Sequence, residues 1–372
     1  MIYHIYWGTS GNAGLYTDEI YQSLNKAGYK QKVFVSYYYP FDYGEKVFFK
    51  RTEMEHCRYK GVARKVLQGI ELIVAFLKIL NSAWKDKPQI VNYSYVSSGN
   101  VAILFFLRKL KHISGCQLVF TCHDVVPFSK DEHEYNKELD IKKKIYAIAD
   151  AYLVHNENSK NDLLRLFSVD NRNIYMHPFP LMDLSKLDTE PNKITTQFDY
   201  LIIGHMRREK GIDLLLETWF RFHEQYPGAR LCIAGNPNYY KDYLDECRNQ
   251  CKNNNVVLKL GFIKDKEYVS LVKSARCVVF PYTAGTNSGV ISTVVSLNRD
   301  VITSDIGMFA DNSFVPKDNM FKAGDRDSLL EKLIAYQKGE LVSDSEKRIE
   351  KYRTTFNKQV KEVYSLLSMN RL

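Results

Sequence analysis

One stretch constrains this chain more than any other: residues 200–211, which read YLIIGHMRREKG. An apolar run enters a glycine-containing basic turn, and an apolar helical pattern follows. In a strand-turn-helix of this kind, backbone N–H groups and the positive end of the helix dipole meet at one point, here beside Arg207 and Lys210. The turn therefore fits a diphosphate. An ordinary strand-to-helix connection with solvated basic side chains would show the same pattern.

The length predicts two domains, because 372 residues exceed what one hydrophobic core usually organises. We expect an N-terminal Rossmann-like domain over residues 1–182 and a polar linker over 183–197. A C-terminal Rossmann-like domain is expected over 198–344. A long charged helix over 345–372 carries one apolar stripe, and we expect it to pack back on the first domain.

Short apolar runs alternate with helical patterns through both halves, which predicts α/β architecture with two doubly wound parallel sheets. The predicted strands cover residues 2–7, 32–36, 90–93 and 117–122 in the first half, and 200–203, 230–235, 256–261, 277–281 and 300–304 in the second. Residues 37–50, after the second of these strands, are interpreted as an aromatic-rich connection.

Composition restricts the class of partner. The net charge of +9 favours an anionic partner, but the basic residues are spread over many predicted helices without a nucleic-acid-binding signature, so we expect no nucleic acid. Seven cysteines without a CxxC pair argue against a disulfide framework and a zinc site. The N-terminal residues lack a secretory signal pattern, from which we expect a cytoplasmic protein.

A second strand-turn-helix follows the first predicted strand, and its turn contains Gly8, Gly11, Asn12 and Gly14. The spacing is not the GxGxxG of dinucleotide-binding turns, so an open loop beside a ligand fits better. The alternative is a loop whose glycines serve only the backbone conformation.

The strand near residues 118–122 ends in His123 and Asp124. Ligands of doubly wound sheets bind at the carboxyl ends of strands. A histidine there can donate to a sugar hydroxyl, and Asp124 could orient it or an acceptor. A structural histidine is the alternative interpretation.

A third glycine-containing turn lies at residues 280–290, which read FPYTAGTNSGV. Its hydroxyl and backbone N–H groups could hold a phosphate or a ribose. A plain helix N-cap by Asn287 or Ser288 would also account for the pattern.

The helical pattern between Arg58 and Lys87 begins with basic residues and continues with a wide apolar face. Such a helix could lie on an anionic membrane. It could equally pack inside the first domain, which we prefer because wide apolar faces are common in core helices.

Five motifs, in this order, are similar to those of glycosyltransferase family 4 and related retaining enzymes of GT-B architecture. They lie at residues 8–14, 121–124, 149–155, 204–211 and 281–289, so the resemblance spans residues 1 to about 310. It implies two Rossmann-like domains that face each other across a cleft, a nucleotide-sugar donor and no metal or other cofactor.

The resemblance also assigns roles to residues. It implies that Arg207 and Lys210 neutralise the nucleotide diphosphate and that His123 lies near the donor sugar, so these three are the candidate catalytic residues. It implies further contacts with the substrates from the glycine-rich turns and from residues near the nucleotide base. The candidate binding residues are Gly11, Asn12, Gly14, Asp124, Gly204, Gly235, Phe262, Ile263, Thr286, Asn287, Ser288, Gly289 and Val290.

One departure from the family pattern concerns two glutamates, eight positions apart, which in many members hold the donor's hydroxyls. Thr286 and Val294 stand at the matching positions here. The chain resembles a subgroup with Pro-Tyr…Ser-Gly-Val that lacks these acids. In such a chain, backbone and hydroxyl groups of residues 286–290 are expected to supply the contacts.

These observations favour a cytoplasmic glycosyltransferase, with peripheral association at the inner face of an anionic membrane as a separate expectation. It would move a sugar to an acceptor hydroxyl on a glycan, a lipid-linked molecule or a protein, with retention of configuration, in bacterial surface-polysaccharide or glycoprotein assembly. One alternative is a non-catalytic GT-B subunit that binds a partner transferase or substrate protein. A GT-B sugar-nucleotide epimerase fits less well, because no carboxylate pair is suited to acid and base catalysis.

Overall fold

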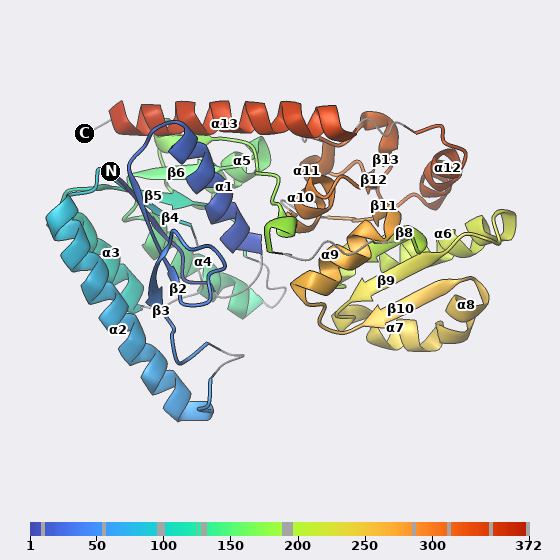
Figure 1. The fold of residues 1–372 in the computed structure, drawn as a ribbon, viewed down its shortest axis with the longest axis horizontal. Coiled ribbons are helices and arrows are strands. Elements are labelled where there is room, and N and C mark those ends of the chain that lie inside the picture. Colours follow the sequence, from blue (N-terminus) through green and yellow to red (C-terminus); the bar gives the residue numbers. More distant parts are fainter. Residues whose placement is uncertain are drawn as a thin grey trace. The chain divides into compact units, whose positions relative to one another are not determined.

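The computed structural model divides into two compact units, and Figure 1 follows the chain through both. Unit 1 contains Met1–Pro180 and Thr355–Leu372, and unit 2 contains Leu181–Thr354. The structure describes residues 1–8, 12–53, 57–94, 101–123, 125–127, 132–187, 196–284, 288–310, 314–341 and 345–369.

Unit 1 is built on a seven-stranded sheet in the order β3-β2-β1-β4-β5-β6-β7, and every strand pair is parallel. Strands β1, β4 and β6 are buried along their whole length, as expected for a sheet covered on both faces by helices. The strands are β1 (Ile2–Ile5), β2 (Gln31–Ser36), β3 (Glu45–Phe48), β4 (Ile90–Tyr93), β5 (Gln117–Thr121), β6 (Ala151–Val154) and β7 (Ile174–Met176).

Helices connect the consecutive strands of this sheet, as is usual for crossovers between parallel strands, except that residues 37–44 join β2 to β3 without a helix. The helices of the N-terminal part are α1 (Asn12–Lys26), α2 (Gly61–Asp86), α3 (Val101–Ser114), α4 (Glu132–Tyr146) and α5 (Glu157–Leu166). Aromatic side chains fill much of the core, where Trp7 lies 5.6 Å from both Phe48 and Tyr93 between ring centroids.

Unit 2 is built on a six-stranded parallel sheet in the order β10-β9-β8-β11-β12-β13. Its core packs around Trp219, which is fully buried and donates from Nε1 to the Asn254 carbonyl over 2.8 Å. The strands are β8 (Phe198–Ile203), β9 (Leu231–Gly235), β10 (Val256–Leu260), β11 (Ala275–Phe280), β12 (Asp300–Ser304) and β13 (Met320–Phe321). The helices are α6 (Ile212–Gln225), α7 (Lys241–Glu246), α8 (Arg248–Asn253), α9 (Asp265–Lys273), α10 (Gly289–Ser296), α11 (Gly307–Ala310) and α12 (Arg326–Gln337).

The last helix, α13 (Ser345–Met369), begins in unit 2 and ends in unit 1. Within unit 1, the Asn92 amide donates to the Tyr364 hydroxyl over 2.9 Å, and the Tyr364 ring lies 6.4 Å from that of His4. The C-terminal segment of unit 1 is therefore packed on the central strands β1 and β4 of its sheet. Of the predicted linker over 183–197, Leu184–Leu187 form a 3₁₀ turn and residues 188–195 lie outside the described part of the chain.

The two doubly wound α/β units confirm the predicted fold class. The predicted strand 90–93 coincides with β4, whereas the predicted strand 2–7 ends earlier, at Ile5. The interpretation of residues 37–50 as a connection was wrong for Glu45–Phe48, which pairs with β2 as edge strand β3. Only Phe48 of this strand is fully buried, so its sequence lacks the continuous apolar run of the central strands.

Candidate functional site

The carboxyl ends of β8 and β9 are shaped by two glycines that no other residue can replace without strain. Gly204 and Gly235 have φ angles of +123° and +133°, and a Cβ on Gly235 would lie 1.9 Å from the Gly204 carbonyl oxygen. The Gly204 N–H donates to the Ala234 carbonyl over 3.0 Å. The carboxyl ends of β8 and β9 are thus held in direct backbone contact.

Gly211 closes the turn from β8 to α6. It has a φ angle of +63°, and a Cβ there would lie 2.1 Å from the Pro281 carbonyl oxygen. The Thr283 N–H donates to the Glu209 carbonyl over 2.9 Å. Both contacts tie the β8–α6 turn to the segment that follows β11, so two of the sequence motifs meet here.

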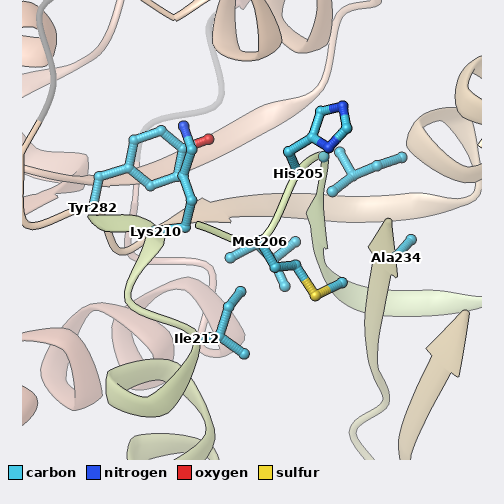
Figure 2. A pocket seen from close by; sticks show the side chains of 9 residues that line it. His205, Met206, Lys210, Ile212, Ala234 and Tyr282 are labelled. Atoms are coloured by element: carbon cyan, nitrogen blue, oxygen red, sulfur yellow. The ribbon is translucent and has the colours of Figure 1, made fainter. Parts of the chain in front are cut away.

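A small pocket, partly open to solvent, lies at this junction. Figure 2 shows the Lys210 amine beside the ring of Tyr282, with His205 and Met206 along the turn. The lining residues are Ile202, Ile203, Gly204, His205, Met206, Lys210, Ile212, Ala234 and Tyr282.

Lys210 is half-buried, so its ammonium group is partly removed from water. Its Nζ atom lies 3.5 Å from the centroid of the Tyr282 ring, where the negative face of the ring attracts it. Burial, and secondly the neighbouring charge of Arg207, lower the pKa of Lys210 to about 7, against a smaller opposing effect of Glu209. The site therefore holds a partly desolvated ammonium group whose charge an incoming anion would stabilise.

Arg207 is in a different environment. Its side chain is 47% exposed, and its Nε atom lies 2.9 Å from Oε1 of Glu209. An exposed ion pair of this kind contributes little to stability. Arg207 and Lys210 are therefore not equivalent, because Lys210 lines the pocket and Arg207 lies at the surface with a counter-ion.

The N-terminus of α10 lies next to this turn. A Cβ on Gly204 would be 3.5 Å from Cγ2 of Val290, in the first turn of that helix. Ser288 is the N-cap residue, and its buried side chain makes no hydrogen bond that caps the helix. Such a helix end presents N–H groups to an anion.

A cluster of three histidines lies in unit 1 around Tyr16. The His123 and His155 rings approach to 3.3 Å between Nδ1 and Nε2. Nδ1 of His155 lies 3.3 Å from the His177 carbonyl, and Nε2 of His177 lies 3.3 Å from the Tyr16 hydroxyl. Tyr16 and His177 are fully buried, whereas His123 is partly exposed.

The hydrogen-bond partners assign the tautomers of this cluster. His155 must donate from Nδ1, because a carbonyl only accepts, so its Nε2 accepts from Nδ1–H of His123. His177 donates from Nδ1 to the Pro178 carbonyl over 2.9 Å, so its Nε2 accepts from Tyr16. The hydrogen bond to His155 thus holds the His123 ring in one orientation, and Nε2 of His123 lies on the side of the ring away from that hydrogen bond.

Burial keeps these rings neutral. It lowers the pKa of His177 to about 4, and burial together with the other histidines lowers the pKa values of His123 and His155. Unfolded histidine has a pKa near 6.5. Between about pH 6.5 and pH 4 the unfolded chain therefore binds protons that the folded cluster does not, and stability is lost as the pH falls.

We expect the free energy of unfolding of unit 1 to be lower at pH 5 than at pH 7.5, by about 2 kcal/mol for a single independent histidine of this kind. Urea unfolding at both pH values measures it. The His177→Gln variant should lose a clear part of the pH dependence, and His112→Gln, at an exposed position of α3, should keep it. Equal pH dependence in all three proteins would contradict the assignment.

The other predicted binding residues are only partly brought together. Gly204 lines the pocket, Gly235 contacts Gly204, and Gly289 and Val290 begin α10. Phe262 is 69% exposed and, like Ile263, does not line the pocket. Gly14 packs in α1, where its carbonyl accepts from Tyr39 over 3.3 Å. Asn12 begins α1, and Gly11, Asp124, Thr286 and Asn287 lie outside the described residues.

Several residues of the pocket and of the histidine cluster were not predicted as site residues. Tyr282 stands in the quoted Pro-Tyr motif, but only the fold places its ring against Lys210. His155 and His177 follow strands β6 and β7, at the same edge of the sheet as His123, and this shared position was the available signal. Among the described residues, no group of three or more His, Cys, Asp or Glu side chains could hold a metal ion. The expectation of metal-independent chemistry stays a prediction.

Comparisons with known proteins place this geometry in context. Residues 197–338 match the family model described as Glycosyl transferases group 1. An uncharacterized glycosyltransferase of Methanocaldococcus jannaschii, MJ1059, is 26% identical over 252 residues, a match that covers 64% of this chain and 61% of the relative.

Solved structures share the whole fold. A crystal structure of Anabaena Alr3699/HepE in complex with UDP and glucose superposes with a TM-score of 0.63 at 14% identity, covering 98% of this chain and 99% of that chain. The lipopolysaccharide outer core galactosyltransferase WaaB gives a TM-score of 0.59 at 13% identity and full coverage, 100%, of both chains. These findings confirm the resemblance to GT-B glycosyltransferases. The narrower subgroup without paired glutamates stays a prediction.

Proposed function

We propose that this chain, which matches the glycosyltransferase group 1 model over residues 197–338, is a glycosyltransferase that takes a sugar from a nucleotide-sugar donor to an acceptor hydroxyl. The observation that supports this most is Lys210, a half-buried ammonium with a lowered pKa at a glycine-locked strand-to-helix turn, with the N-terminus of α10 next to that turn. A partly desolvated cation beside N–H donors is suited to a diphosphate.

The chemistry needs such a site. When the sugar leaves, negative charge develops on the β-phosphate, and a fixed cation in a partly dry pocket stabilises that charge more in the transition state than in the ground state. Lys210 supplies this cation, and Ser288 and the first N–H groups of α10 supply neutral donors. Arg207 adds a second, exposed positive charge.

His123 is proposed to act on the donor sugar, as the family resemblance implies. His155 holds its ring in one tautomer and orientation, so the neutral imidazole is preorganised for a hydrogen bond. His155 is a positioning residue in this scheme, since it touches His123 and not the reacting atoms.

The finer assignments are also proposals. UDP is a reasonable first nucleotide, because the Alr3699/HepE structure contains UDP and glucose. WaaB is named as a lipopolysaccharide galactosyltransferase, which supports a role in bacterial surface-polysaccharide or glycoprotein assembly, with a glycan, lipid-linked or protein acceptor. Retention of configuration, independence of metal and a cytoplasmic location complete the proposal.

A panel of nucleotide sugars tests the function. We expect one of UDP-glucose, UDP-galactose, UDP-N-acetylglucosamine, ADP-glucose and GDP-mannose to stabilise the protein, by about 2.7 kcal/mol at 100 times its dissociation constant. The stabilising donor should then be consumed when a suitable acceptor extract is added. If no member of a broad nucleotide-sugar panel shifts the thermal unfolding, the proposal is wrong.

One observation favours a second candidate, a non-catalytic GT-B subunit. Val294, at the position of the second family glutamate, is fully buried in α10, and its apolar side chain has no atom that could bind a donor hydroxyl. A subunit that binds a partner transferase or substrate protein would show neither donor-dependent stabilisation nor donor consumption. The same panel therefore separates the two candidates.

A further inference from the structure

Helix α2 exposes a continuous apolar stripe along its whole length. Figure 1 shows α2 and α3 side by side along one flank of unit 1, and Phe105 of α3 is exposed as well. Positions 62, 66, 70, 73 and 77 recur at intervals of three or four, which places them on one helix face. The exposed fractions are 77% for Val62, 58% for Val66, 53% for Ile70, 60% for Ile73, 46% for Val74, 61% for Leu77 and 62% for Trp84.

The opposite face of α2 is fixed in the core. Ala75, Phe76, Ile79 and Ala83 are buried there, and the Phe76 ring stacks on Phe106 of α3 with centroids 3.9 Å apart. The helix is long and apolar enough to cross a membrane, but only by length and composition. Because one face belongs to the core of unit 1, α2 can offer its other face to a membrane surface without leaving the fold.

The charges on α2 are divided by sign. Both carboxylates are engaged within unit 1: Glu71 accepts from the Arg51 N–H and the Thr52 hydroxyl, and Asp86 pairs with Lys32 over 2.6 Å. The exposed charged residues of the helix are Lys65, Lys78 and Lys85.

Exposed positive charges also lie just before α2 and on α3. Arg58 and Lys60 are exposed just before α2, and Arg108 and Lys109 are exposed on α3. Amphipathic rings lie near both ends of the stripe, where Tyr59 is 53% exposed and Trp84 is 62% exposed. An apolar stripe bordered by cations, with Tyr and Trp at its ends, matches the boundary between lipid tails and anionic headgroups.

We propose that the exposed face of α2 with Phe105 is a docking surface for an anionic phospholipid membrane, on which α2 lies in the plane of the interface. From Val62 to Trp84 the stripe is about 33 Å long at 1.5 Å per residue. A second copy of this chain fits less well, because a two-fold contact through the stripe would bring the cations that border it, Lys65, Lys78 and Lys85, close to those of the other copy without carboxylates to pair with them. The proposal is independent of the proposed catalytic function.

Co-sedimentation of the full chain with phosphatidylcholine vesicles, with or without phosphatidylglycerol, tests the proposal. We expect binding to the anionic vesicles at low salt and weaker binding at high salt. The Ile73→Glu/Leu77→Glu variant should bind at least tenfold more weakly. Replacing Lys65, Lys78 and Lys85 with Gln should weaken binding about fivefold per lysine at low salt.

Leu366→Glu is the matched control, since Leu366 is 50% exposed on α13, and it should bind like the unchanged protein. All substituted positions are exposed, so thermal unfolding should be unaffected. Equal binding of the Ile73→Glu/Leu77→Glu variant and the control would overturn the proposal. So would a vesicle-independent dimer that Ile73→Glu/Leu77→Glu dissociates, because the stripe would then be an interface between copies.

Discussion

Replacing Lys210 with Met is expected to lower turnover of the cognate nucleotide sugar by about 10²–10³-fold, the usual effect of removing one transition-state charge stabiliser. The variant should also unfold at a higher temperature. Burial lowers the pKa of Lys210 to about 7, which means that the fold disfavours the charged form, and Met removes that unfavourable burial. Loss of activity with a gain in stability distinguishes a functional cation from a structural one.

Two variants calibrate this result. Arg207→Met should cost less activity than Lys210→Met, roughly tenfold, because Arg207 is half exposed and paired with Glu209. Lys252→Met, at an exposed position of α8, should change neither turnover nor stability. If Lys210→Met stays within about threefold of the unchanged protein, less than roughly 1 kcal/mol of transition-state stabilisation, Lys210 is not the diphosphate ligand.

Gly235→Ala is expected to be among the most destabilising single substitutions in unit 2. Its φ of +133° is strained for any residue with a Cβ, and the new atom would lie 1.9 Å from the Gly204 carbonyl oxygen. Backbone strain of this kind costs about 1–3 kcal/mol, and the overlap must be relieved by moving the β8–α6 turn as well. We therefore expect a loss above about 3 kcal/mol in urea unfolding and weaker donor binding.

Gly261→Ala provides the matched control. Gly261 has nearly the same φ, +134°, at the end of the neighbouring strand, but nothing lies within 4 Å of the point that a Cβ would occupy there. This variant should show the backbone strain alone and retain donor binding. If the two alanine variants lose the same stability and both bind the donor, the close approach of Gly235 to Gly204 does not shape the site.

The sequence predicted the site best where local pattern and chemistry coincide. The apolar run before Gly204 predicts β8, and the alternation of strands and helices predicts two doubly wound units. The burial of Lys210 could not be predicted, because it depends on Tyr282, which follows another strand 72 positions later. Spacing along the chain also does not show that Gly235 touches Gly204, since that contact follows from the parallel pairing of β8 and β9.

The histidine cluster and α2 show two further limits of prediction from the sequence. His123 was singled out by its position after β5, but its partner His155 and the more distant His177 follow β6 and β7, and only the strand order brings them together. For α2, we preferred a packed core helix. The structure shows one face packed and the other exposed, and a helix that is apolar on both faces gives no periodic signal to separate these cases.

Proton uptake on donor binding tests the diphosphate site most directly. With a pKa of about 7 in the free protein, Lys210 is about 90% neutral at pH 8, and a bound diphosphate should recharge it. Calorimetric titration with UDP-glucose, or with the strongest binder of the panel, in buffers of different ionisation enthalpy should show uptake of most of one proton at pH 8 and of much less at pH 6. Binding at pH 8 without proton uptake, or equal uptake by Lys210→Met, would contradict the account.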